Sequence, residues 1–90
     1  QDNYADDIAN SEAINIFGNI ILRSKENLGW ALELFKINVQ LYFDDGNLWD
    51  SLGDGYNANN LKEEAIRSYQ KAIELGYKNS QKKLIALIKN

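Results

Sequence analysis

The stretch Trp49-Asp50-Ser51-Leu52-Gly53-Asp54-Gly55-Tyr56 decides the fold of this chain. With Ala65, Tyr69 and Ala72 it follows the pattern W-x2-L-G-x2-Y and then A-x3-Y-x2-A. Large apolar residues recur there at helical spacing, which indicates two amphipathic helices. The small residues Gly53 and Ala65 let these helices approach closely where they cross. We therefore predict a pair of antiparallel helices joined by a short turn.

An earlier copy of this hairpin precedes it in the chain. Ala31 and Phe35 recur 34 residues later as an alanine and a tyrosine. Gly18 recurs as a glycine 35 residues later, so the first copy carries one extra residue. The simplest place for that residue is the polar turn at 24–27. A period of this length is typical of helical repeat proteins.

Apolar periodicity and turn residues predict five helices and no strand. We expect an acidic leader over residues 1–10, with Asn10 and Ser11 as N-caps. A helical domain follows over residues 11–90, with repeat 1 at about 11–45, repeat 2 at about 46–79 and a capping helix at about 80–90. The expected helices span about 11–23, 28–42, 48–58, 62–75 and 80–89.

The predicted core lies on one side of each helix. In the second helix it consists of Leu28, Ala31, Phe35, Val39 and Tyr42, and in the first helix of Ile14, Phe17 and Ile21. Asn38 occupies a position on the buried side, where an amide needs hydrogen-bond partners to avoid a cost of roughly 1–3 kcal/mol. Gly76 is expected to end the fourth helix.

Residues 47–77 resemble a complete tetratricopeptide repeat, and residues 11–43 resemble a degenerate first copy with Asn15 in the place of the tryptophan. The resemblance implies an all-α fold. Two TPR-like helix-turn-helix repeats and a C-terminal capping helix would form a short right-handed superhelix. It also implies a non-catalytic scaffold that contacts other polypeptides.

A second resemblance concerns the context of the domain. The run 31–42 followed by 46–53 is similar to repeat pairs that follow the catalytic domains of bacterial serine hydrolases, namely esterases and β-lactamase-like enzymes. This implies an accessory domain of a larger bacterial protein, with the active site outside these 90 residues. The alternative is a fragment of a longer TPR adaptor.

The composition argues against an enzyme complete in itself. The chain has no Cys and no His, which removes the usual nucleophile, the usual general base and nearly every zinc site. Ser68–Lys71 and Ser80–Lys83 match Ser-x-x-Lys. The chain has no Thr and therefore no Lys-Thr-Gly motif, and it has no Ser-Asp-Asn, so both partner motifs of such hydrolases are missing. We predict no catalytic residue, no metal and no cofactor.

Charge is distributed unevenly along the chain. Residues 1–60 hold three basic and ten acidic residues, a net charge of −7, whereas residues 61–90 hold seven basic and three acidic residues, a net charge of +4. Nucleic-acid binding favours one continuous basic face, so it is not expected. No apolar run approaches the roughly 20 residues that cross a membrane. Head-to-tail contacts between copies are one reading of the asymmetry, and two solvated faces are the other.

The first helix of each hairpin is expected to line an inner groove, where residues three or four apart point the same way. Because this surface is polar and acidic, a neutral or basic peptide would fit it better than a carboxylate. Simple solvation of the scaffold is the alternative. The expected groove residues are Glu12, Asn15, Asn19 and Leu22 in the first repeat and Asn47, Asp50, Asp54 and Asn57 in the second.

A second apolar stripe runs along the second helix and consists of Trp30, Leu34 and Ile37, whose counterparts 34 residues later are all polar. A helix that is apolar on two faces needs cover on both. We expect this stripe to contact a parent catalytic domain or a second copy, which would make a homodimer. The alternative is that the leader, with Tyr4 and Ile8, folds back over it.

Overall fold

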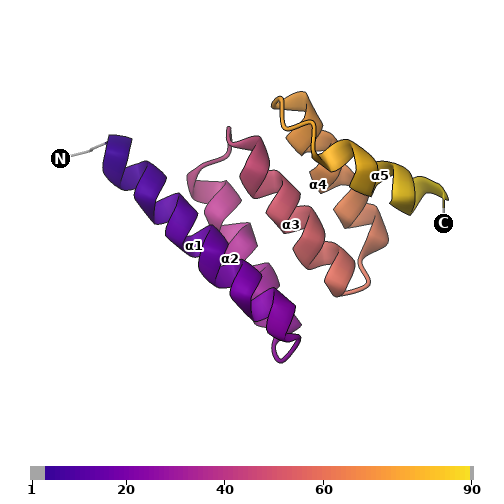
Figure 1. The fold of residues 1–90 in the computed structure, drawn as a ribbon, viewed down its shortest axis with the longest axis horizontal. Coiled ribbons are helices and arrows are strands. Elements are labelled where there is room, and N and C mark those ends of the chain that lie inside the picture. The colour runs from indigo at the N-terminus through magenta and orange to yellow at the C-terminus, as the bar shows by residue number, and fades with distance from the viewer. Residues whose placement is uncertain (1–3, 90) are drawn as a thin grey trace.

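The computed structural model describes the backbone of residues 4–89 and the side chains from Asn10 onward. This part of the chain contains five helices and no strand, so the predicted all-α class is confirmed (Figure 1). The helices are α1 (Tyr4–Ser24), α2 (Leu28–Leu41), α3 (Gly46–Ala58), α4 (Lys62–Glu74) and α5 (Ser80–Lys89).

The helices stack in chain order. Each one packs against the next, and α1 also touches α3. The domain measures 46 × 31 × 16 Å, and α1 and α5 lie at opposite ends of its long direction (Figure 1). Hairpin 1 (α1 and α2) and hairpin 2 (α3 and α4) are therefore neighbours, and α5 packs on the far side of hairpin 2.

The first helix begins earlier than the sequence suggested. Residues 4–10 belong to α1, so the predicted start of the first helix at about residue 11 is wrong, and residues 1–3 lie outside the described part. Ser11 does not start a helix but is buried within one, where its carbonyl oxygen accepts a hydrogen bond of 3.0 Å from Asn38 Nδ2. Residues 4–10 contain neither Gly nor Pro, so nothing there breaks the helix. The side chains of Tyr4 and Ile8 lie outside the described residues.

The extra residue of the first repeat lies in the predicted turn. Lys25 and Asn60 both have the left-handed backbone, with φ of 60° and 64°. Two residues, Glu26 and Asn27, separate Lys25 from α2, whereas Leu61 alone separates Asn60 from α4. Asn27 caps α2, since its side chain accepts a hydrogen bond from the backbone of the third helical residue. The remaining helix boundaries agree with the prediction within two residues.

The same close contact holds each hairpin together. A Cβ added to Gly18 would overlap the ring of Phe35, and one added to Gly53 would overlap the ring of Tyr69. Both aromatic side chains are fully buried, and so are the alanines one turn earlier in α2 and α4. Because an aromatic ring fills the space that a side chain on the facing helix would need, glycine is required at both crossings.

One predicted core residue is on the surface. Phe17 is more than half exposed, although Ile14 and Ile21 on the same helix are partly buried as expected. Its counterpart 35 residues later, Leu52, is buried because α2 covers it, whereas α1 has no preceding helix in the described part of the chain. The prediction failed because the residue needs an outer neighbour to become core.

Asn38 is buried as predicted, with 1% of its surface exposed. Its amide nitrogen bonds the Ser11 carbonyl oxygen and so ties α2 to α1. No donor in the described part of the chain reaches its side-chain oxygen. A buried acceptor without a partner lowers stability, so this position is a weak point of hairpin 1.

Candidate interaction surfaces

The predicted inner groove is occupied by the protein itself. Asp50 is only 5% exposed, which contradicts its assignment to an open groove surface. Its two carboxylate oxygens accept hydrogen bonds from Ser80 Oγ at 2.5 Å and from Lys83 Nζ at 2.8 Å. Both donors come from α5, so this helix closes over the acidic end of α3.

Asp54 belongs to the same network. It accepts a 2.6 Å bond from the Tyr69 hydroxyl, and Lys83 Nζ lies 3.0 Å from its other oxygen. Burial raises the pKa of Asp54, although the bonds to Tyr69 and Lys83 act in the opposite direction. The four side chains of Asp50, Asp54, Tyr69 and Lys83 are thus mutually satisfied rather than directed at a ligand.

The two donors of this network keep their protons at neutral pH. Burial and the neighbouring Asp54 raise the pKa of the Tyr69 hydroxyl far above its ordinary value. Burial lowers the pKa of Lys83, but its hydrogen bond to Asp50 and the charge of Asp54 outweigh this, so the pKa is raised overall. Ser80, at the start of α5, is fully buried, and its hydroxyl donates a hydrogen bond to Asp50.

The counterparts of Asp50 and Asp54 in hairpin 1 are Asn15 and Asn19, and both are partly buried. Asn19 Nδ2 bonds the backbone oxygen of Asn15 one turn earlier, at 2.9 Å. The side-chain oxygen of Asn15 is buried and finds no donor among the described residues. The remaining predicted groove residues, Glu12, Asn47 and Asn57, are exposed, whereas Leu22 is partly buried against the core.

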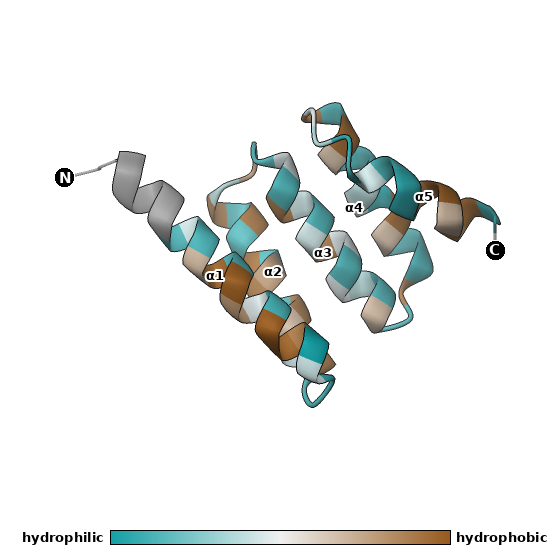
Figure 2. Cartoon of the chain, viewed as in Figure 1, coloured by the Kyte–Doolittle hydropathy of each residue, from teal (hydrophilic) through white to brown (hydrophobic). Residues whose placement is uncertain are grey.

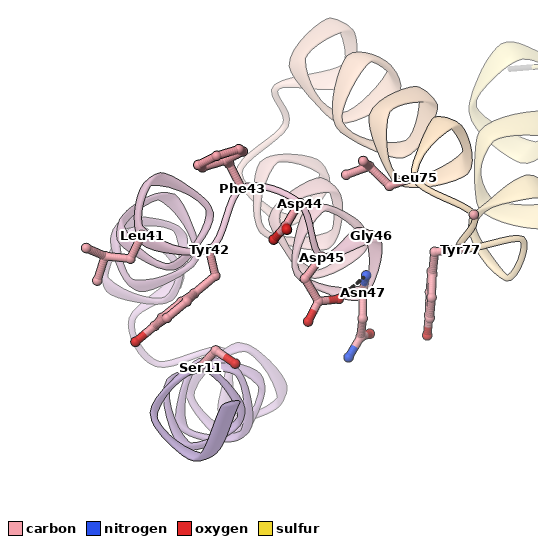
Figure 3. A pocket seen from close by; sticks show the side chains of 11 residues that line it. Ser11, Leu41, Tyr42, Phe43, Asp44, Asp45, Gly46, Asn47, Leu75 and Tyr77 are labelled. Carbon is pink, nitrogen blue, oxygen red and sulfur yellow. Dashed lines mark hydrogen bonds between the residues drawn. The ribbon is translucent and has the colours of Figure 1, made fainter. Parts of the chain in front are cut away.

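One hollow of about 540 Å³ lies where the ends of the hairpins meet. Figure 3 shows the rings of Tyr42 and Tyr77 on either side of Asp45 and Asn47. Asp45 caps α3, since its carboxylate accepts a bond of 3.0 Å from the Asn47 backbone nitrogen. The exposed Asp44 adds a second carboxylate. The hollow therefore combines aromatic walls with negative charge, a setting that suits a cation.

The predicted stripe on α2 is exposed. Trp30 and Ile37 show 52% and 48% of their surface, and Leu34 between them is partly buried. Leu41, one turn beyond, is also exposed and extends the stripe along the helix. Residues 4–10 belong to α1 and continue that helix, so they do not form a separate segment folded back over the stripe.

A further apolar surface escaped the sequence analysis. Ile16, Phe17 and Ile20 on α1 are 53% to 60% exposed, and hydrophobic residues follow one another along this helix in Figure 2. The available signal was the same as for α2, because α1 is apolar on two faces. Large exposed apolar patches on a protein mark contact sites, so hairpin 1 has two such surfaces.

The described residues contain neither a candidate metal site nor a candidate membrane span. Among the described residues, no group of three His, Cys, Asp or Glu side chains could hold a metal ion. None of the helices described is both long and apolar enough to cross a membrane. Comparison with protein-family models, with curated proteins and with solved structures finds no match to this chain.

Proposed function

We propose that this chain is a non-catalytic protein-interaction module made of two TPR-like hairpins and a capping helix in a short right-handed superhelix. The repeated contact of a glycine with an aromatic ring in both hairpins supports the TPR-like assignment. The sequential packing of antiparallel helices supports it as well. On this proposal, α5 is the capping helix and the network around Asp50 fastens it.

The observation that carries the interaction proposal is the α2 stripe, namely Trp30, Leu34, Ile37 and Leu41. Exposed tryptophan and aliphatic residues lose contact with water when a partner covers them, and tryptophan is enriched among residues that dominate binding energy. The corresponding positions of α4 are Glu64, Ser68, Lys71 and Leu75, so hairpin 2 lacks this surface. The stripe is therefore the proposed contact with a parent catalytic domain or another protein.

The experiment compares two positions that differ only in their hairpin. A photo-reactive amino acid replaces Trp30 in one variant and Glu64 in the other, and cells expressing each variant in the complete protein are irradiated. We expect a discrete cross-link, within the polypeptide or to a partner, from position 30 only. Equal cross-linking at both positions, or none at position 30, would contradict the proposal.

The broader context is an accessory domain of a bacterial hydrolase. Reading the complete gene tests this directly. An adjoining domain with a Ser-x-x-Lys or Gly-x-Ser-x-Gly motif would support the accessory role. Further 34-residue repeats would instead support a longer adaptor.

A second candidate function is recognition of a basic peptide, now centred on the hollow beside Asp45 rather than on Asp50. The aromatic and acidic lining of this hollow favours a Lys or Arg side chain. Double replacement D44N and D45N removes both charges, and an Asn at position 45 remains a good N-cap. Titration with Arg-containing and Glu-containing peptides, followed by NMR at Gly46, should show binding of the basic peptide to the unmodified chain alone.

A further inference from the structure

The outward face of α1 (Ile16, Phe17 and Ile20) has a covered counterpart within the same molecule. The equivalent residues of hairpin 2, which follow 35 positions later, are Ser51, Leu52 and Gly55. All three are buried, whereas each of the α1 residues is more than half exposed. The difference lies in what is packed outside each helix.

In hairpin 2 the covering element is α2. A Cβ on Gly55 would lie 2.9 Å from Cδ2 of Phe35 and 3.4 Å from Cα of Leu32. Leu52 belongs to the same apolar cluster as those two residues. This face of the first helix in a hairpin is therefore built to receive another helix, and on α1 the described chain leaves it open.

The other end of the domain carries a smaller apolar edge. On α5, Ser80, Leu84 and Leu87 lie toward the protein. Ile85 and Ile88 are more than half exposed and stand three residues apart, on one side of the helix. Figure 2 shows this hydrophobic half of α5 at the end of the domain opposite α1.

The two ends differ in charge. Glu12 is exposed four residues before Ile16 on α1, and Arg23 is exposed three residues after Ile20. Lys82 and Lys89 are exposed three residues before and four residues after Ile85 on α5. Residues at these spacings share a helix face, so the α1 rim carries an acid at its N-terminal end and a base at its C-terminal end, whereas the α5 rim is basic.

We infer that the α1 face of one molecule receives α5 of a second copy of this chain. The apolar residues Ile85 and Ile88 pack against Ile16, Phe17 and Ile20, and Glu12 in the α1 rim pairs with Lys82 in the α5 rim. Such an interface joins two different surfaces, so each added molecule leaves one free α1 face and one free α5 edge. Association therefore continues beyond a dimer and weakens as salt screens the rims.

The inference goes beyond the proposed function because it uses neither the α2 stripe nor the hollow. The two can therefore fail separately. A control variant with W30Q and I37Q removes the stripe and is expected to leave head-to-tail association unchanged. Loss of association in this control, with association retained in the end variants described next, would overturn the inference.

Two variants, each blocked at one end, test the geometry. The first carries F17Q and I20Q on α1, and the second carries I85Q and I88Q on α5. All four positions are exposed, and glutamine is a good helix former, so the fold should persist. Far-UV circular dichroism checks this before sedimentation velocity is measured at low salt over a range of protein concentrations.

The unmodified chain should sediment as species that grow past the dimer with concentration. Each blocked variant should remain a monomer, because every contact needs one intact face of each kind. An equimolar mixture of the two variants should form a dimer and stop there. A mixture that stays monomeric, or an unmodified chain that stays monomeric or stops at a dimer, would overturn the inference.

A charge exchange provides a second test that leaves the apolar residues untouched. Glu12→Lys alone and Lys82→Glu alone should each weaken association. Mixing the two variants should restore polymer growth, because position 12 of either variant then meets an opposite charge at position 82 of the other. The double variant, which restores opposite charges across every contact, should associate again. Unchanged association in both single variants at low salt would show that the rims do not meet.

Discussion

The two hairpins have the same interior and different exteriors. Phe35 and Tyr69 fill equivalent positions, and each ring lies against a glycine of the facing helix. On the outer side, α2 has the exposed residues Trp30 and Ile37, where α4 has a glutamate and a lysine. Interior packing constrains the residues that hold a hairpin together, whereas the outer residues are free to serve contacts. The difference between the copies is the reason why the proposed partner contact lies on hairpin 1.

The hairpins differ also in how their polar inner residues are satisfied. Asp50 accepts hydrogen bonds from Ser80 and Lys83 of α5, and Asp54 accepts one from Lys83. Asn15, by contrast, has a buried oxygen without a donor in the described part of the chain. Unpaired buried acceptors cost stability, and a charged network that is fully paired rigidifies its surroundings. Hairpin 2 with α5 is accordingly expected to be the more stable half.

The largest effect is expected from filling the glycine at each hairpin crossing. Gly53→Ala places a methyl group on the Tyr69 ring, and Gly18→Ala does the same on Phe35. Overpacking of this kind costs about 1–3 kcal/mol in free energy of unfolding. Urea denaturation of both variants measures the loss. If Gly18→Ala leaves the free energy of unfolding unchanged, hairpin 1 is not packed as tightly as hairpin 2.

A pH dependence is expected from hairpin 2 and α5. The folded-state pKa values of Tyr69 and Lys83 lie above their ordinary values of 10.0 and 10.5. Groups with raised values contribute stability that is complete below those ordinary values and is lost as pH rises, because the unfolded chain gives up its protons first. The buried Tyr69 adds a slope of up to about 1.4 kcal/mol per pH unit. The partly exposed Lys83 adds less, because solvent screens its ion pairs.

Tyr69→Phe removes one of these two groups. The free energy of unfolding, measured with denaturant, should therefore fall less steeply for this variant than for the unmodified chain as the pH rises from neutral to above 10.5. Replacing Tyr56, which lies outside the network, controls for the general effect of alkaline pH. If Tyr69→Phe and the control show the same slope as the unmodified chain, the hydroxyl is not held by Asp54 as described.

The smallest effect is a gain in stability. Gly29 lies in the first turn of α2 with no atom within 4 Å of the position that a Cβ would take. Gly29→Ala should therefore stabilise the chain by about 0.5–1 kcal/mol, since alanine favours the helix. The same urea titration measures it. If Gly29→Ala raises the free energy of unfolding and Gly18→Ala lowers it, the effects of helix propensity and of packing are separated within one hairpin.

The sequence predicted most features whose cause lies within a few residues. Gly76 ends α4 with a φ of +95°, and the additional residue of the first repeat lies in the 24–27 turn. Capping and turn preferences depend on local backbone geometry, so they can be read along the chain. The exposed stripe at Trp30 and Ile37 was also predictable, because the second copy provides a reference that lacks it.

Features that depend on distant helices were misassigned. Asp50 has the pattern of a surface residue on α3, but its donors lie 30 and 33 residues further along the chain. Phe17 has the periodicity of a core residue, but no described helix covers it. Periodicity indicates which residues share a face of a helix, but it does not say which face meets a neighbour.

By itself, the sequence determined the helices, the turns and the glycine–aromatic pairs of both hairpins, because helical spacing and residue size act locally. Only the tertiary structure decided whether the outer and inner faces of the helices are buried or exposed. The docking of α5 converted Asp50 and Asp54 from an expected groove into an internal network. The absence of a covering helix over α1 within residues 4–89 left Phe17 exposed. Burial depends on the position of whole helices, and so it is settled only when they pack.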